Sequence, residues 1–163
     1  MASGDTLLIL TPLASEYDDD APATHDVLNN HPLLDFCDDD FEYATWSAIM
    51  PRHYDQSGIT VLIHWTHLTA TEGDVDWDVA FERIGDQIQD IYYTSFAAYK
   101  SADNNTVPGT TGLVDVVSLE FSDGAEIDSI AAGELFRVRI RRDGVSDTAV
   151  GDAQLLMVEL KET

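Results

Sequence analysis

Four arginines stand close together in the segment LFRVRIRRD (135–143). They are half of the eight Lys and Arg residues in a chain that has 31 Asp and Glu residues and a formal charge of −23. Because alternate side chains of a strand share a face, Arg137, Arg139 and Arg141 lie together, opposite an apolar face. Guanidinium groups bind carboxylates bidentately. The pattern therefore predicts a basic strand face that meets an acidic partner, with ligand binding as the alternative.

Residues 74–82 carry a matching acidic pattern. Asp74, Asp76 and Asp78 share one face of the predicted strand, and the other face is apolar. Cross-strand pairs of opposite charge contribute about 0.2–1 kcal/mol each. We therefore predict that the arginine row and the aspartate row pair, either between neighbouring strands or across a subunit boundary. Replacing Arg137 and Arg139 together by alanine is then expected to weaken folding or assembly.

Two aspartate triplets offer oxygen ligands of the kind that calcium prefers. They are Asp18, Asp19 and Asp20, and Asp38, Asp39 and Asp40. Neither triplet matches the twelve-residue EF-hand loop. His64 and His67 are three residues apart on one predicted strand, so they point to opposite faces and do not chelate one metal. The sequence predicts no cofactor, with calcium at the triplets as the alternative.

Motifs for catalysis are absent from the sequence. There is no Gly-x-Ser-x-Gly elbow, no helical zinc-protease motif and no glycine-rich phosphate loop. Cys37 is followed by three aspartates, which disfavour its thiolate. Carboxylates about 7 Å apart on the aspartate row fall in the range that glycosidases use, but so acidic a chain contains such pairs by chance. We predict that the protein is not an enzyme.

Three tryptophans fall on predicted strands. Trp77 lies on the apolar face of its strand, and Trp65 aligns with the apolar residues of another, so both are predicted in the core. Trp46 could be in the core or exposed. Exposed aromatic rings are a means by which lectin-type modules bind sugars, so Trp46 is the open candidate.

Runs of strand-like sequence separated by Gly, Pro, Asn and Asp predict an all-β fold, an eight-stranded antiparallel sandwich of the jelly-roll kind. The predicted strands are 6–11, 41–49, 59–69, 74–84, 92–99, 113–121, 134–142 and 154–161. Residues 101–112 are predicted to form a loop, and 84–91 a loop or a short helical turn. Residues 1–40 are predicted to be an N-terminal strand with an acidic, irregular arm, and 41–163 the sandwich domain.

The charge of −23 disfavours nucleic acids and anionic membranes as partners. The segment MASGDTLLIL has an acidic residue where a signal peptide is basic, and its apolar run is too short to span a membrane. These features predict a protein made in the cytoplasm without a signal peptide.

Three segments, HWTHLTATEGDVDWDVAFERIGD, GELFRVRIRRDG and GDAQLLMVELKE, resemble small β-sandwich virion proteins of tailed bacteriophages. The resemblance covers about residues 58–163. It implies a decoration or cement protein on the capsid exterior, with the major capsid protein and copies of itself as partners, often as a trimer. Under it, the arginine and aspartate rows are expected at interfaces. The alternative is a carbohydrate-binding jelly-roll module of a fibre, a tail or a surface assembly, with a saccharide as ligand.

Overall fold

The computed structural model describes residues 4–163. Its ten strands are β1 (Thr6–Leu10), β2 (Thr24–Leu28), β3 (His31–Phe36), β4 (Phe41–Ile49), β5 (Ile59–His67), β6 (Asp74–Arg83), β7 (Lys100–Thr106), β8 (Asp115–Phe121), β9 (Leu135–Asp143) and β10 (Ala153–Glu162). The helical turns are η1 (Pro12–Ala14), α1 (Gly85–Ile88) and η2 (Ala125–Ile127). No helix among these residues is long and apolar enough to span a membrane.

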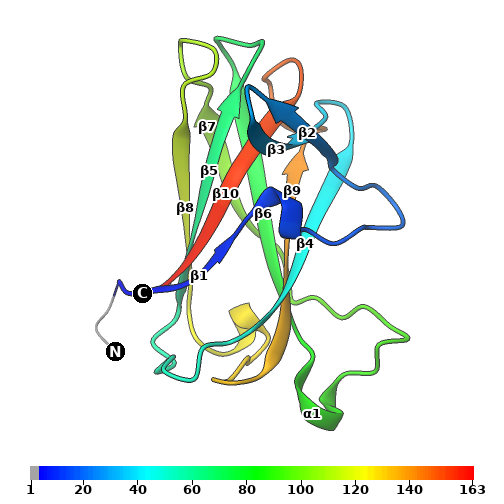
Figure 1. Ribbon diagram of the computed structural model, residues 1–163, viewed down its shortest axis with the longest axis vertical. Coiled ribbons are helices and arrows are strands. Elements are labelled where there is room, and N and C mark those ends of the chain that lie inside the picture. The colour runs from blue at the N-terminus through cyan, green and yellow to red at the C-terminus, as the bar shows by residue number, and fades with distance from the viewer. Residues whose placement is uncertain (1–3) are drawn as a thin grey trace.

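The strands form two antiparallel sheets that face each other (Figure 1). Sheet A has the order β2-β3-β10-β5-β8. β1 also pairs with β10, along residues 158–161, whereas β3 pairs with residues 153–155 of that strand. Sheet B has the order β4-β9-β6-β7. The predicted antiparallel sandwich is confirmed, with ten strands within residues 4–163 instead of the predicted eight.

One apolar core fills the space between the sheets. The apolar face predicted for β6 is confirmed, because Val75, Trp77, Val79 and Phe81 are all fully buried, but Asp78 and Glu82 on the opposite, predicted outer face are buried as well. Trp65 and Trp77 lie in this core as predicted and pack edge to face, with ring centroids 6.0 Å apart. Trp46, the open case, is also buried and donates its indole N–H to the Thr11 carbonyl at 2.9 Å.

Part of the segment predicted to be an irregular arm is a hairpin. β2 and β3 are joined by Asn29 and Asn30, whose φ angles of 47° and 65° suit a tight two-residue turn. Pro32 lies in β3 outside the stretch that pairs with β10, so its missing N–H removes no bond to that strand. The hairpin extends sheet A at the edge opposite β8.

The predicted position of the strand after β6 is wrong. Residues 92–99 are not a strand, and 100–106, predicted to be a loop, form β7. β7 has a polar sequence, but its side chains and backbone bond to the aspartates of β6: Ser101 Oγ to Asp78, the Asn104 N–H to Asp76 and Thr106 Oγ1 to Asp74, at 2.5, 2.6 and 2.8 Å. Hydrogen bonds to the aspartates of β6, and not a pattern of alternating apolar residues, therefore explain why these residues form a strand.

Candidate functional site

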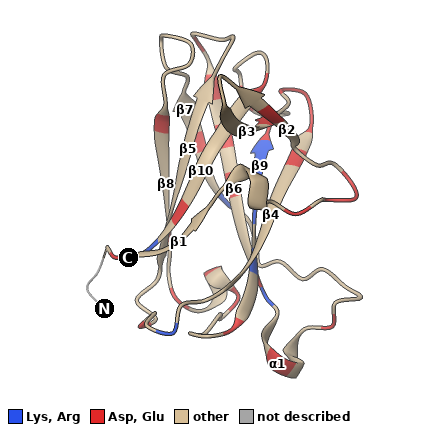
Figure 2. Ribbon diagram, in the orientation of Figure 1, with Lys and Arg blue, Asp and Glu red and all other residues tan. Residues whose placement is uncertain are grey.

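The arginine row lies on the outer face of sheet B, where each guanidinium has a carboxylate partner. Arg141 pairs with Asp78 at 2.7 Å, and Arg139 with Asp18 at 3.0 Å. Arg137 lies between Glu82 and Glu16, at 3.2 and 3.4 Å. Figure 2 shows the blue basic residues of β9, with Asp and Glu residues scattered over the other elements.

Aromatic rings cover the same arginines. Arg139 lies 4.4 Å from the ring centroid of Phe96 and 5.2 Å from that of Tyr43. Arg141 lies 3.9 Å from the ring of Tyr99 and 4.4 Å from that of Phe41. Phe96 and Tyr99 belong to residues 95–99, which lie beside β6 before β7 begins, since the Ala97 N–H donates to the Phe81 carbonyl at 2.8 Å. These contacts hold that segment on the sheet.

Of the predicted aspartate partners, only Asp78 contacts the arginine row. Asp74 and Asp76 receive hydrogen bonds from β7 instead. The carboxylates that complete the row, Glu16, Asp18 and Glu82, were not predicted, because two of them come from a distant loop. The arginine row and the aspartate row both find their partners within one chain. That these two rows lie at a subunit interface stays a prediction.

Each aspartate triplet accepts a hydrogen bond from a backbone N–H. Asp18 Oδ1 accepts the Asp20 N–H, Asp38 Oδ2 accepts the Gly151 N–H at 2.6 Å, and Asp40 Oδ1 accepts the Phe41 N–H. Residues 4–163 contain no group of three or more His, Cys, Asp or Glu side chains arranged to hold a metal ion. Calcium at the triplets stays a prediction.

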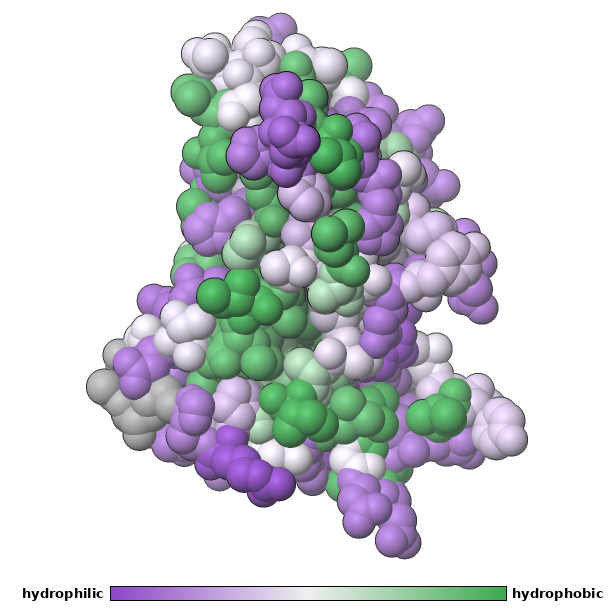
Figure 3. Space-filling model, viewed as in Figure 1, coloured by the Kyte–Doolittle hydropathy of each residue, from purple (hydrophilic) through white to green (hydrophobic). Residues whose placement is uncertain are grey.

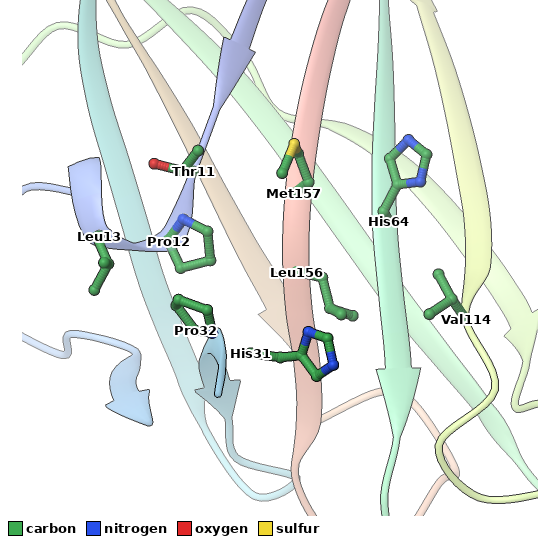
Figure 4. Close-up of a pocket in the computed structure, with 9 residues that line it drawn as sticks. All are labelled: Thr11, Pro12, Leu13, His31, Pro32, His64, Val114, Leu156 and Met157. Carbon is green, nitrogen blue, oxygen red and sulfur yellow. The ribbon is translucent and has the colours of Figure 1, made fainter. Parts of the chain in front are cut away.

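The outer face of sheet A differs from that of sheet B, because it carries an open, mostly apolar depression. This sheet A hollow has a volume of about 530 Å³. It is lined by Thr11, Pro12, Leu13, His31, Pro32, His64, Val114, Leu156 and Met157 (Figure 4). Apolar residues gather over β1 and β10 on this face (Figure 3). The neighbouring side chains of Ile9 and Val116 are exposed as well.

A β-bulge shapes the floor of the sheet A hollow. Leu155 pairs with Trp65 and Met157 pairs with His64, so Leu156 is an extra residue in β10. The side chains of Leu156 and Met157 therefore both line the outer face, although they are neighbours in sequence. Bulges often lie beside functional sites because they redirect side chains.

Two walls rise from this floor. On one side lie Pro12 and Leu13 of η1 and Pro32 of β3, and on the other lie His64 of β5 and Val114 before β8 (Figure 4). His31 and His64 bring the imidazole rings, and Thr11 brings a hydroxyl. His64 and His67 point to opposite faces of β5 as predicted, since His67 is fully buried.

Among residues 4–163, no Asp, Glu, Lys or Arg side chain lines the sheet A hollow. This is unusual in a chain with 31 acidic residues. The floor offers alkyl and thioether groups, while the hydroxyl and the two imidazoles are hydrogen-bonding groups. Such a surface suits a ligand that has apolar faces and neutral polar groups.

A second hollow of about 690 Å³ lies between the loops 69–73 and 148–151. Buried polar groups hold both loops. His67 Nδ1 accepts the Ala70 N–H at 2.9 Å, which leaves Nε2 to donate to the Gly151 carbonyl at 3.1 Å. Arg142, fully buried, binds both carboxylate oxygens of Asp147 and also the Gly151 carbonyl. Burial lowers the pKa of His67 and Arg142 lowers it further.

No family model matches the sequence, and no curated protein matches it. Solved structures do share the fold. The carbohydrate-binding module CBM6cm-2 of Cellvibrio mixtus lichenase 5A, in complex with cellotriose, has a TM-score of 0.58 at 7% identity, covering 98% of this chain and 99% of that one. The C-terminal CBM6 of LamC from Zobellia galactanivorans has a TM-score of 0.56 at 8% identity, covering 95% and 98%.

The CBM22-1 xylan-binding domain of Paenibacillus barcinonensis Xyn10C has a TM-score of 0.56 at 9% identity. The match covers 99% of this chain and 97% of that domain. The fold is a jelly-roll β-sandwich. At these identities the likeness concerns the fold alone. None of these neighbours is a phage structural protein, and the capsid partner, the trimer and the virion location stay predictions without support from the comparisons.

Proposed function

We propose that this chain is a non-catalytic binding module that holds a saccharide in the sheet A hollow. The observation that carries the proposal is an uncharged, largely apolar depression on the open face of a sheet in a chain of formal charge −23. Its volume falls in the usual range for ligand sites, about 300–1,000 Å³. The shared fold with carbohydrate-binding modules is consistent with the proposal.

The lining residues suggest how a sugar is bound. The C–H face of a pyranose ring packs on Leu156 and Met157, and Val114 and Pro32 enclose its edges. The rings of His31 and His64 exchange hydrogen bonds with ring hydroxyls, and Thr11 adds a third polar group. All three tryptophans are buried in the core, so stacking on tryptophan is not part of this mode of binding.

The acidic pairs considered for catalysis have structural partners. Asp78 is 3% exposed and pairs with Arg141, and Asp74 and Asp76 accept bonds from β7. A hydrolase needs one carboxyl as acid and a second as base or nucleophile beside the substrate. The sheet A hollow has neither, so binding without catalysis is the function that its chemistry supports.

Affinity electrophoresis tests the proposal. The protein is run through native gels that contain mixed-linkage β-glucan, laminarin, arabinoxylan, galactomannan or hydroxyethylcellulose, and retardation reports binding. We expect at least one polymer to retard the protein. His64→Ala and Met157→Ser are each expected to weaken that binding by about tenfold, or about 1.4 kcal/mol.

His53→Ala is the matched control, because His53 is exposed in the β4–β5 connection and does not line the hollow. It is expected to bind as the wild type does. Failure of every polymer to retard the wild type contradicts the proposed function. Equal binding by wild type, His64→Ala and Met157→Ser contradicts its location.

A further inference from the structure

We infer that the saccharide site selects uncharged polysaccharides and rejects those that carry carboxylate or sulfate groups. This inference rests on the proposed function and names the class of ligand for the same hollow. It is drawn from the distribution of charge over the whole chain and from the way in which the basic residues are used.

The molecule is surrounded by a negative electrostatic field. With 31 acidic and eight basic residues, the surface potential is negative. An anionic polymer that approaches the hollow meets this field over about 10 Å at 0.1 M salt. A neutral polymer meets no such barrier.

Most of the basic groups are already paired with carboxylates. Among residues 4–163, six of the eight Lys and Arg side chains form ion pairs with carboxylates of the same chain: Arg83, Lys100, Arg137, Arg139, Arg141 and Arg142. None of the eight lines the sheet A hollow. The arginine row, which could bind a polyanion, is matched by Asp18, Asp78 and Glu82 and lies on the opposite sheet.

The lining residues that the structure describes offer no cation to an anionic sugar. Recognition of a uronate or a sulfate ester calls for Arg, Lys or a bound cation that pairs with the anion. The polar groups of the lining are Thr11, His31 and His64. These groups suit hydroxyls, and the apolar floor disfavours a desolvated anion.

Polymer pairs with the same backbone and different charge test the inference. We would measure binding of the full chain to hydroxyethylcellulose and carboxymethylcellulose, to arabinoxylan and glucuronoxylan, and to methyl-esterified and de-esterified pectin. Each pair is measured at ~0.01 M and ~1 M salt, where the Debye length is about 30 Å and about 3 Å. We expect the neutral member of a bound pair to bind equally at both salt concentrations.

The anionic member is expected to bind at least about tenfold more weakly at low salt and to recover part of the difference at high salt. This dependence is opposite in sign to that of a basic protein that binds a polyanion. Equal binding of both members at low salt overturns the selection and leaves the proposed function standing. Absence of binding to every neutral and anionic polymer overturns the proposed function itself.

A gain-of-function variant tests the role of the lining. Met157→Lys places one cation in the hollow at a side chain that is already partly exposed. Val150→Lys makes the same change of net charge in the second hollow. We expect Met157→Lys alone to gain affinity for carboxymethylcellulose, and an equal gain, or no gain, in both variants contradicts selection by the lining.

Discussion

The two outer faces of the sandwich meet solvent in different ways. On sheet B, arginines pair with carboxylates, and the rings of Phe96 and Tyr99 lie over the same arginines. On sheet A, apolar side chains such as Ile9 and Met157 are exposed around an uncharged hollow. A face whose arginines are paired with carboxylates of the same chain contributes to folding, whereas the apolar depression on sheet A stays open to solvent in the part of the chain that the structure describes.

This difference assigns separate roles to the two faces. Exposed apolar area is a liability for solubility, and a contiguous patch often marks a binding site. We therefore expect changes on the β9 side to alter stability without altering binding. Changes in the sheet A hollow are expected to alter binding with little effect on stability.

The largest effect is expected from the buried arginine at the end of β9. Asp147→Ala leaves the fully buried Arg142 without its carboxylate, which costs about 3–5 kcal/mol of unfolding free energy. Urea unfolding monitored by the buried tryptophans measures it. The control is Asp86→Ala, an exposed residue of α1. A loss below about 1 kcal/mol would show that Arg142 is solvated or re-paired.

A smaller effect is expected on the outer face of sheet B. Phe96→Ala removes the ring that faces Arg137 and Arg139, at a cost of about 1–2 kcal/mol, and exposes residues 95–99 of the β6–β7 connection to limited proteolysis. Tyr92→Ala, in the same connection but 89% exposed, is the matched control and is expected to be nearly neutral. Identical stability and cleavage of the two variants would mean that the rings do not hold the segment.

The smallest effect concerns pH. The folded-state pKa of His67 is lowered by burial, so the unfolded chain binds the proton more readily. The stability due to neutral His67 is complete above the unfolded pKa of about 6.5 and is lost as the pH falls below it. Unfolding experiments should therefore show the stability difference between wild type and His67→Gln narrowing from pH about 7.5 to about 5.5. A constant difference would exclude this linkage.

Alternation of apolar residues was enough to predict most of the fold. The patterns of 74–82 and 135–142 placed β6 and β9 correctly and put arginines and aspartates on their outer faces. β7 was missed because KSADNNT has no apolar alternation and depends on acceptors supplied by β6. The β2–β3 hairpin was missed because Pro32 and the acidic residues resemble loop sequence, although Asn29 and Asn30 are a turn signal.

The site was less accessible to prediction from the sequence. The lining of the sheet A hollow comes from five separate segments between residues 11 and 157, and its main signal is the run LLMV, which interrupts the alternation of β10. His64 was noted, but only as a poor metal ligand. The arginine row drew attention by its composition, and it proved to be the face that is already satisfied within the chain.

The central claim is that the sheet A face binds and the sheet B face does not. Its most direct test is an NMR titration of the labelled protein with an oligosaccharide of whichever neutral polymer retards it in gels. We predict that the signals of His31, His64, Val114 and Met157 shift, while those of Tyr43, Phe96 and Arg139 stay unchanged. Shifts confined to the sheet B residues would contradict the account.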